Sequence, residues 1–96
     1  MSAVIETAVA ELNAKMGGEG FDGIAKFVIE DEGSIVIDGN GARASDDEAQ
    51  VTLSADAETF KAILDGDLDA TAAFMTGRLS VDGDMGLAMQ LGTVLS

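Results

Sequence analysis

The stretch AKFVIEDEGSIVID, at residues 25–38, decides the fold class of this chain. In its first part, apolar residues occupy the odd positions while Lys26 and Glu30 stand at even ones, which is the period of a β-strand with one buried face. An acidic turn that ends in Gly33 follows, and a second apolar run begins directly after it. Two such runs joined by a tight polar turn predict an antiparallel pair of strands.

Strand signals continue on the C-terminal side of this pair. Gly39, Asn40 and Gly41 predict a second tight turn, because Asn and Gly tolerate a positive φ angle. A short strand at residues 42–44 and a further alternating strand at residues 50–55 complete the run. Consecutive strands joined in this way predict an antiparallel meander with one face open to solvent.

The residues before the first strand predict a helix with one buried stripe. Ser2 can cap its start, and Gly17 with Gly18 ends it where a left-handed residue is favoured. The apolar residues that share one face of this helix are Ile5, Ala8, Val9, Leu12 and Met16.

Two helices, a strand and a last helix are predicted after the meander. Asp56 and Asp69 each stand at the start of a helical pattern, and a glycine follows each pattern. Residues 78–82 alternate as a strand, and Asp84 caps a last helix over residues 85–95. This order predicts an α+β fold in which one sheet carries helices over one face.

The chain is strongly acidic, with 5 Lys and Arg against 18 Asp and Glu and a formal net charge of −13. Phosphate contacts require cations, so this balance argues against a nucleic acid partner and allows at most weak, transient membrane contact. The same charge opposes self-association, and we expect a monomer or a weak dimer. The first residues contain no basic region followed by a long apolar run, so we expect no signal peptide and a cytoplasmic location.

The residue types needed for most site chemistry are missing. The chain has no Cys and no His, which excludes thiolate and imidazole metal sites and the Ser-His-Asp triad. The letters GEGFDG at residues 18–23 match a dinucleotide fingerprint, but they follow a helix and open a strand, the reverse of the phosphate-binding context. Asp65, Asp67 and Asp69 begin like a calcium loop, but Ala70 stands where that loop needs Gly. We therefore predict no catalytic residues, no metal and no cofactor.

The last predicted helix is apolar over a wide arc. At about 100° per residue its apolar side chains span roughly 220°, about twice the width that packing against one core face needs. The two sides of the arc are the leucines Leu87, Leu91 and Leu95 and the methionines Met85 and Met89. We expect the leucine side to pack on the sheet. The flexible methionine side then needs another apolar partner, and the pattern leaves open whether this is core, a second chain or an apolar ligand.

The segment FMTGRLSVDGDM, at residues 74–85, resembles the motif of the sterol carrier protein type 2 family. Residues 57–67 and the ending at residues 87–91 resemble the same family, and the order of the predicted strands agrees with it. The resemblance implies a single domain over residues 1–96, with a five-stranded, mostly antiparallel sheet and helices that enclose an apolar tunnel. It also implies a stand-alone bacterial protein that binds a fatty acid, a fatty acyl-CoA or a sterol-like lipid and transfers it between membranes.

Together with this resemblance, the apolar pattern predicts a non-catalytic lipid carrier. Lys61 or Arg78 is expected to pair with a lipid head group at the mouth of the tunnel. The residues expected to line the tunnel are Phe60, Ile63, Phe74, Met75, Leu79, Val81, Met85, Ala88 and Met89. An empty apolar cavity of about 300 Å³ would cost roughly 7 kcal/mol, so we expect the tunnel to be occupied, collapsed or closed by the last helix.

Two other functions fit the same pattern. A protein-interaction domain would use the apolar C-terminal helix as its interface with a partner chain. An enzyme-accessory domain would present a lipid to a separate catalyst.

Overall fold

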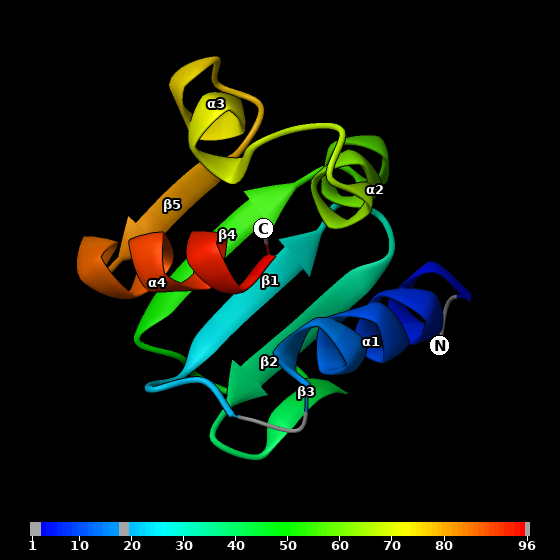
Figure 1. The fold of residues 1–96 in the computed structure, drawn as a ribbon, viewed down its shortest axis with the longest axis vertical. Helices are drawn as coiled ribbons and strands as arrows, with labels where there is room; N and C mark the ends of the chain where they lie inside the picture. Colours follow the sequence, from blue (N-terminus) through cyan, green and yellow to red (C-terminus); the bar gives the residue numbers. More distant parts are fainter. Residues whose placement is uncertain (1–2, 18–19, 96) are drawn as a thin grey trace.

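Within residues 3–17 and 20–95, a computed structural model of the chain places five strands and four helices, with backbone alone described for residues 94 and 95 (Figure 1). The predicted roles of Ser2, Gly18 and the Leu95 side chain lie outside this description. The predicted element order is confirmed, and the fold is α+β. In chain order the elements are α1 (Ala3–Met16), β1 (Ala25–Ile29), β2 (Gly33–Asp38), β3 (Gly41–Ala44), β4 (Val51–Ala55), α2 (Ala57–Asp65), α3 (Ala70–Met75), β5 (Ser80–Gly83) and α4 (Met85–Leu95).

The sheet has the strand order β3-β2-β1-β4-β5. β2 is antiparallel to both β1 and β3, and β5 is antiparallel to β4. β4, however, pairs with β1 in parallel, with Ala25 opposite Val51. The sheet is therefore mixed, and the prediction of a mostly antiparallel meander is wrong at its centre.

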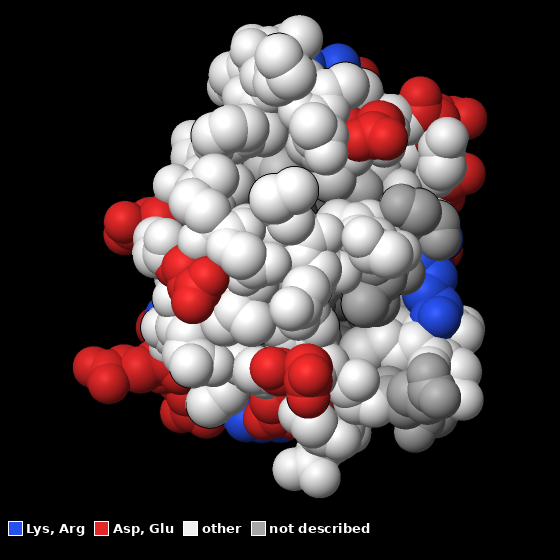
Figure 2. All heavy atoms as spheres, turned by 60° about the vertical axis from the view of Figure 1, so that its left-hand side comes forward, with Lys and Arg blue, Asp and Glu red and all other residues white. Residues whose placement is uncertain are grey.

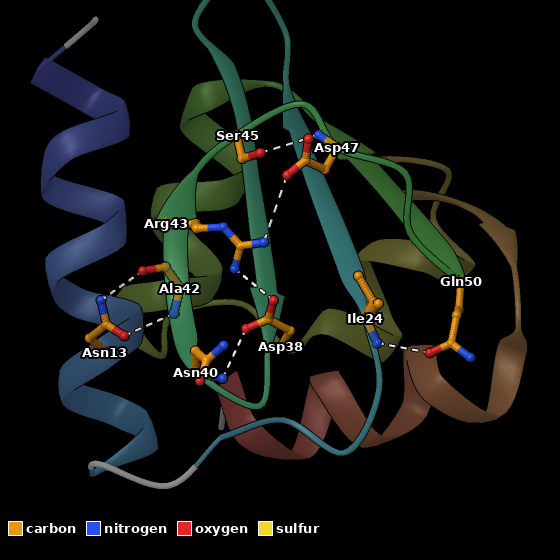
Figure 3. Close-up of polar contacts among 9 residues, drawn as sticks. All are labelled: Asn13, Ile24, Asp38, Asn40, Ala42, Arg43, Ser45, Asp47 and Gln50. Atoms are coloured by element: carbon orange, nitrogen blue, oxygen red, sulfur yellow. Dashed lines mark hydrogen bonds and ion pairs between the residues drawn. The ribbon is translucent and has the colours of Figure 1, made fainter.

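Residues 45–50, called the strap below, are the reason for the parallel pair. β3 lies at one edge of the sheet, and the strap carries the chain across β2 and β1 before β4 begins on the other side of β1 (Figure 3). Two ion pairs hold the strap: Lys26 Nζ lies 3.3 Å from Asp46 Oδ1, and Arg43 Nη2 lies 3.8 Å from Asp47 Oδ2. A six-residue acidic connection was not recognisable in the sequence as a crossing of the sheet.

The end of the strap is fixed beside β1 by a pair of hydrogen bonds. The backbone N–H of Gln50 donates to the carbonyl oxygen of Ile24 at 2.8 Å. The backbone N–H of Ile24 in turn donates to Oε1 of Gln50 at 2.9 Å (Figure 3). These bonds align the start of β4 with the start of β1.

The sheet face that carries the strap is covered at its centre. Val36 stands between Lys26 and Arg43 in the register of the three strands β1, β2 and β3. Both cations bind the strap, and Val36 is completely buried. The prediction that this face is open to solvent therefore fails at the centre of the sheet.

The helices pack on the other face, and Figure 1 shows α1 in front of β2 and β3 and α4 in front of β4 and β1. β1 and β4 bury every second residue towards this helix layer, as their alternation predicts. α1 buries Ile5, Ala8, Leu12 and Met16 and half-buries Val9, so its predicted stripe is confirmed.

Asn13 ties α1 to the edge strand of the sheet. Its Nδ2 donates to the carbonyl oxygen of Ala42 at 3.0 Å, and the N–H of Ala42 donates to its Oδ1 at 2.9 Å (Figure 3). The side chain thus pairs backbone groups that an edge strand otherwise leaves free. Gly41 permits this approach, because a Cβ on it would lie 2.6 Å from Oδ1 of Asn13 and its φ angle is +107°.

Arg43, one of the two cations that hold the strap, also forms an ion pair with Asp38 on β2. Arg43 Nη1 donates to Asp38 Oδ2 at 2.6 Å, and this hydrogen bond, helped by the N–H of Asn40, lowers the pKa of Asp38 below its ordinary value. A lowered carboxyl pKa contributes stability that is present above the ordinary Asp pKa of about 3.9 and is lost as the pH falls through the lowered value.

We therefore expect Asp38→Asn to reduce the free energy of unfolding at neutral pH, and the gap to wild type to close as the pH falls below about 4. Urea unfolding of both proteins across this range measures the gap. Asp22→Asn removes the same charge from an exposed residue and is the control. A gap that stays constant with pH would contradict the role given to Asp38.

Candidate functional site

α2 is a short amphipathic helix with a firm start and end. Oδ1 of Asp56 accepts a hydrogen bond from the backbone N–H of Thr59 at 2.7 Å. Hydrogen bonding to Thr59 lowers the pKa of Asp56. Gly66 ends the helix in the left-handed conformation with a φ angle of +82°. The predicted cap is confirmed. These two caps fix where α2 begins and ends.

That face buries Phe60, Ile63 and Leu64. The ring of Phe60 lies against that of Phe27 on β1, with centroids 4.2 Å apart and planes tilted by 56°. Lys61, the next residue along the helix, is exposed. The same turn of α2 therefore presents an aromatic ring to the core and a cation to the surface.

A groove of about 440 Å³ lies between α1 and α2. Its lining is mostly apolar, with one cation and two carboxylates among the lining residues. From α1 these are Ala3, Val4, Thr7, Ala8 and Glu11, and from α2 they are Ala57, Glu58, Phe60, Lys61 and Leu64. This volume falls within the range of about 300–1,000 Å³ that is usual for small-ligand sites.

Lys61 and Arg78 were both expected near a lipid head group. The structure places Lys61 in the wall of the groove, whereas Arg78 does not line it. Among the described residues, no carboxylate lies within 4.0 Å of the Lys61 ammonium. Lys61 is therefore able to meet an anionic group at the groove, since no ion pair of its own has to break.

The nine residues predicted to line a tunnel do not share one environment. Phe60, Ile63 and Leu79 are buried in the core. Val81 and Ala88 are half-buried against it. The remaining four side chains are exposed, with exposed fractions of 42% for Phe74, 80% for Met75, 48% for Met85 and 75% for Met89. The structure does not show the tunnel.

These four exposed residues, called the α3–α4 patch below, belong to helices whose starts were predicted. Asp69 Oδ1 accepts from the N–H of Thr71 at 2.7 Å, and Asp84 Oδ1 accepts from the N–H of Leu87 at 3.1 Å. Leu91 is completely buried and Leu87 is half-buried, so the leucine side of α4 packs on the core as predicted. The methionine side, with Met85 and Met89, faces outwards.

The α1 wall of the groove was missed from the sequence. Val4, Thr7 and Glu11 follow one another at helical spacing beside the buried stripe of α1. This spacing was a usable signal that α1 has a second contact surface. It does not reveal which element faces that surface, because the neighbour of α1 is set by the sheet topology.

The described residues provide little for other kinds of site. They contain no group of three His, Cys, Asp or Glu side chains placed to hold a metal ion. In the same part of the chain, no helix is both long enough and apolar enough to cross a bilayer.

Comparison with known proteins assigns the family. A model of the SCP-2 sterol transfer family matches residues 5–96. The chain belongs to this family. The resemblance seen in the motif at residues 74–85 is thereby confirmed, and it extends over nearly the whole chain.

Several of the proteins that the chain resembles in sequence are much longer than it is. Hydroxysteroid dehydrogenase-like protein 2 of Xenopus tropicalis is 36% identical over 81 residues, which are 76% of this chain and 19% of that protein. The chain spans between 12% and 19% of the length of the curated relatives it matches.

Two solved structures from Aedes aegypti share the fold. Sterol Carrier Protein 2 Like 2 has a TM-score of 0.78 at 20% identity, with 95% of both chains covered. Sterol Carrier Protein-2 in complex with the C16 fatty acid palmitate has a TM-score of 0.77 at 24% identity, with 100% of this chain and 97% of that chain covered. At these identities the likeness shows the fold alone.

Phe60 lies in the core, whereas Phe74 lies at the surface, so the two residues can be compared by mutation. We expect Phe60→Ala to lower the free energy of unfolding by about 3–5 kcal/mol, because it removes a buried ring that packs on Phe27. Phe74→Ala, the matched change at an exposed ring, should cost less than about 1 kcal/mol, since its side chain already meets solvent. Chemical denaturation of both variants measures the difference. Equal losses would show that Phe74 is core as well.

Proposed function

We propose that this SCP-2 family domain is a non-catalytic lipid carrier, and that the groove between α1 and α2 holds the alkyl chain of a fatty acid. The observation that carries the proposal is the groove itself, about 440 Å³ of mostly apolar space with the cation Lys61 in its wall. A fatty acid has the matching parts, one long apolar chain and one carboxylate.

The apolar wall supplies the driving force for binding. Each buried methylene contributes about 0.8 kcal/mol, so ten of them contribute roughly 8 kcal/mol. This is comparable to the cost of about 4–15 kcal/mol for the lost translational and rotational freedom of the ligand. Alkyl burial alone therefore gives modest affinity, which suits a carrier that must release its cargo.

Lys61 is the proposed partner of the head group. It is exposed at the groove and forms no ion pair among the described side chains. Glu11 and Glu58 also line the groove, so an anionic head group meets one favourable and two unfavourable charges. Only a carboxylate placed close to the Lys61 ammonium gains from the site, which favours a compact head group over a large phosphorylated one such as that of acyl-CoA.

Two further findings support a lipid ligand. The family is one of sterol transfer, and the Aedes aegypti protein of the same fold was solved with palmitate. Of the nine residues predicted to contact lipid, Phe60 lines the groove. We propose that Ile63, which is buried on the same helix, supports its floor.

A second candidate function is the presentation of lipid to an enzyme. The relatives favour this function. One of them is named hydroxysteroid dehydrogenase-like protein 2, and this chain matches only 19% of it, so most of that protein lies outside the matched part. The groove would serve both functions in the same way. The cytoplasmic location and the monomeric or weakly dimeric state stay predictions of the sequence.

Lys61→Gln tests the head-group contact. With delipidated protein, we expect palmitate to bind at one site, and Lys61→Gln to raise its Kd about tenfold, since a charge-assisted hydrogen bond contributes about 1.5–3 kcal/mol. Hexadecanol, which has no charge, should bind wild type and variant alike. Isothermal titration calorimetry with both probes measures these constants.

Lys15→Gln is the control, because it removes the same charge from α1 at a position outside the groove. A loss of palmitate affinity that is equal in the two variants would show only a general charge effect. No binding of either probe to wild type would overturn the proposed function.

A further inference from the structure

The α3–α4 patch is not used by the groove. Its members Phe74, Met75, Met85 and Met89 are all exposed, and none of them lines the space between α1 and α2. Exposing three methionines and an aromatic ring on neighbouring helices is costly for a water-facing surface, since each side chain would gain about 1.5–3 kcal/mol on full burial. Such a patch marks a surface that is covered in function.

The patch is also free of charge. Neither α3 nor α4 contains an Asp, Glu, Lys or Arg. Figure 2 turns this side of the molecule forward, and acidic side chains lie around a broad central area that carries none. The charges nearest to the two helices in the sequence are Asp69, Arg78, Asp82 and Asp84, which add up to an acidic rim.

This charge pattern decides between possible partners. Two copies of the chain would each bring a formal charge of −13, so pairing patch to patch is opposed by repulsion. An anionic lipid surface is opposed for the same reason. A zwitterionic lipid surface has no net charge to repel the rim, and it accepts apolar side chains between its head groups.

The side chains suit such a surface. Methionine is unbranched and flexible, so it adapts to an irregular apolar environment. Both α3, with 6 residues, and α4, with 11, are too short to span a bilayer, which needs about 20 residues. The contact is therefore one of shallow insertion at the interface.

We propose that the α3–α4 patch docks the protein weakly and reversibly on a zwitterionic lipid surface. This inference rests on the proposed function, because a lipid carrier must meet the membrane with which it exchanges cargo. The docking surface and the groove are separate, so each can be impaired without the other.

Vesicle flotation with pure phosphatidylcholine, and with phosphatidylcholine mixed with phosphatidylserine, tests the proposal. We expect wild type to associate with the first, and to associate less with the second. Met75→Gln combined with Met89→Gln should reduce association with phosphatidylcholine at least about tenfold, because both side chains lose their apolar contact with lipid. Ile24→Gln, at an exposed residue outside the patch, should change it little.

Palmitate binding, measured on the same proteins, separates this inference from the proposed function. The double variant should keep the wild-type Kd, since it leaves the groove intact. Failure of wild type to bind palmitate would defeat the carrier function but leave the vesicle result standing.

Three results would overturn the docking surface. One is a preference of wild type for vesicles with phosphatidylserine. Another is unchanged vesicle association of the double variant. The third is absence of vesicle association by wild type, and a dimer or a complex with a purified protein partner that the double variant loses would then show what covers the patch instead.

Discussion

The strap at residues 45–50 is the constraint on which the rest of the architecture depends. It takes the chain from the edge strand β3 across two strands, so that β4 pairs in parallel with β1. Lys26 and Arg43 hold it down on one face of the sheet. With that face occupied, α1 and α4 pack on the other one, and the groove and the patch both arise within this helix layer.

The helix layer divides the molecule into an apolar groove and an apolar patch with different electrostatics. The groove has Lys61 in its wall, while the patch lies on two helices that carry no charge. A protein with a formal charge of −13 can therefore attract one carboxylate locally and still approach an uncharged surface. Under the two proposals, binding a lipid and meeting a lipid surface are tasks of different residues.

Local signals in the sequence predicted the elements well. Asp56, Asp69 and Asp84 cap the helices as expected, because a short polar side chain before an apolar helical pattern has few other roles. The alternation in β1 and β4 correctly gave their buried faces, since the side-chain period of a strand is a local property.

Long-range features could not be predicted in the same way. The parallel pairing of β4 with β1 depends on where the strap crosses, and nothing in its six residues encodes a direction. The clamp of Asn13 on Ala42 joins residues 29 positions apart. The same limit applies to the site. The pattern identified Phe60 and Lys61 as candidates, but the α1 wall opposite them follows from tertiary packing.

The central claim is that a fatty acid binds between α1 and α2, and its most direct test is an amide NMR titration of the delipidated protein with palmitate. We predict saturable shifts centred on Thr7, Ala8, Lys61 and Leu64, from the two walls of the groove. Shifts centred instead on Leu79, Val81 and Met89, with α1 unaffected, would contradict the account and place the ligand beneath α4.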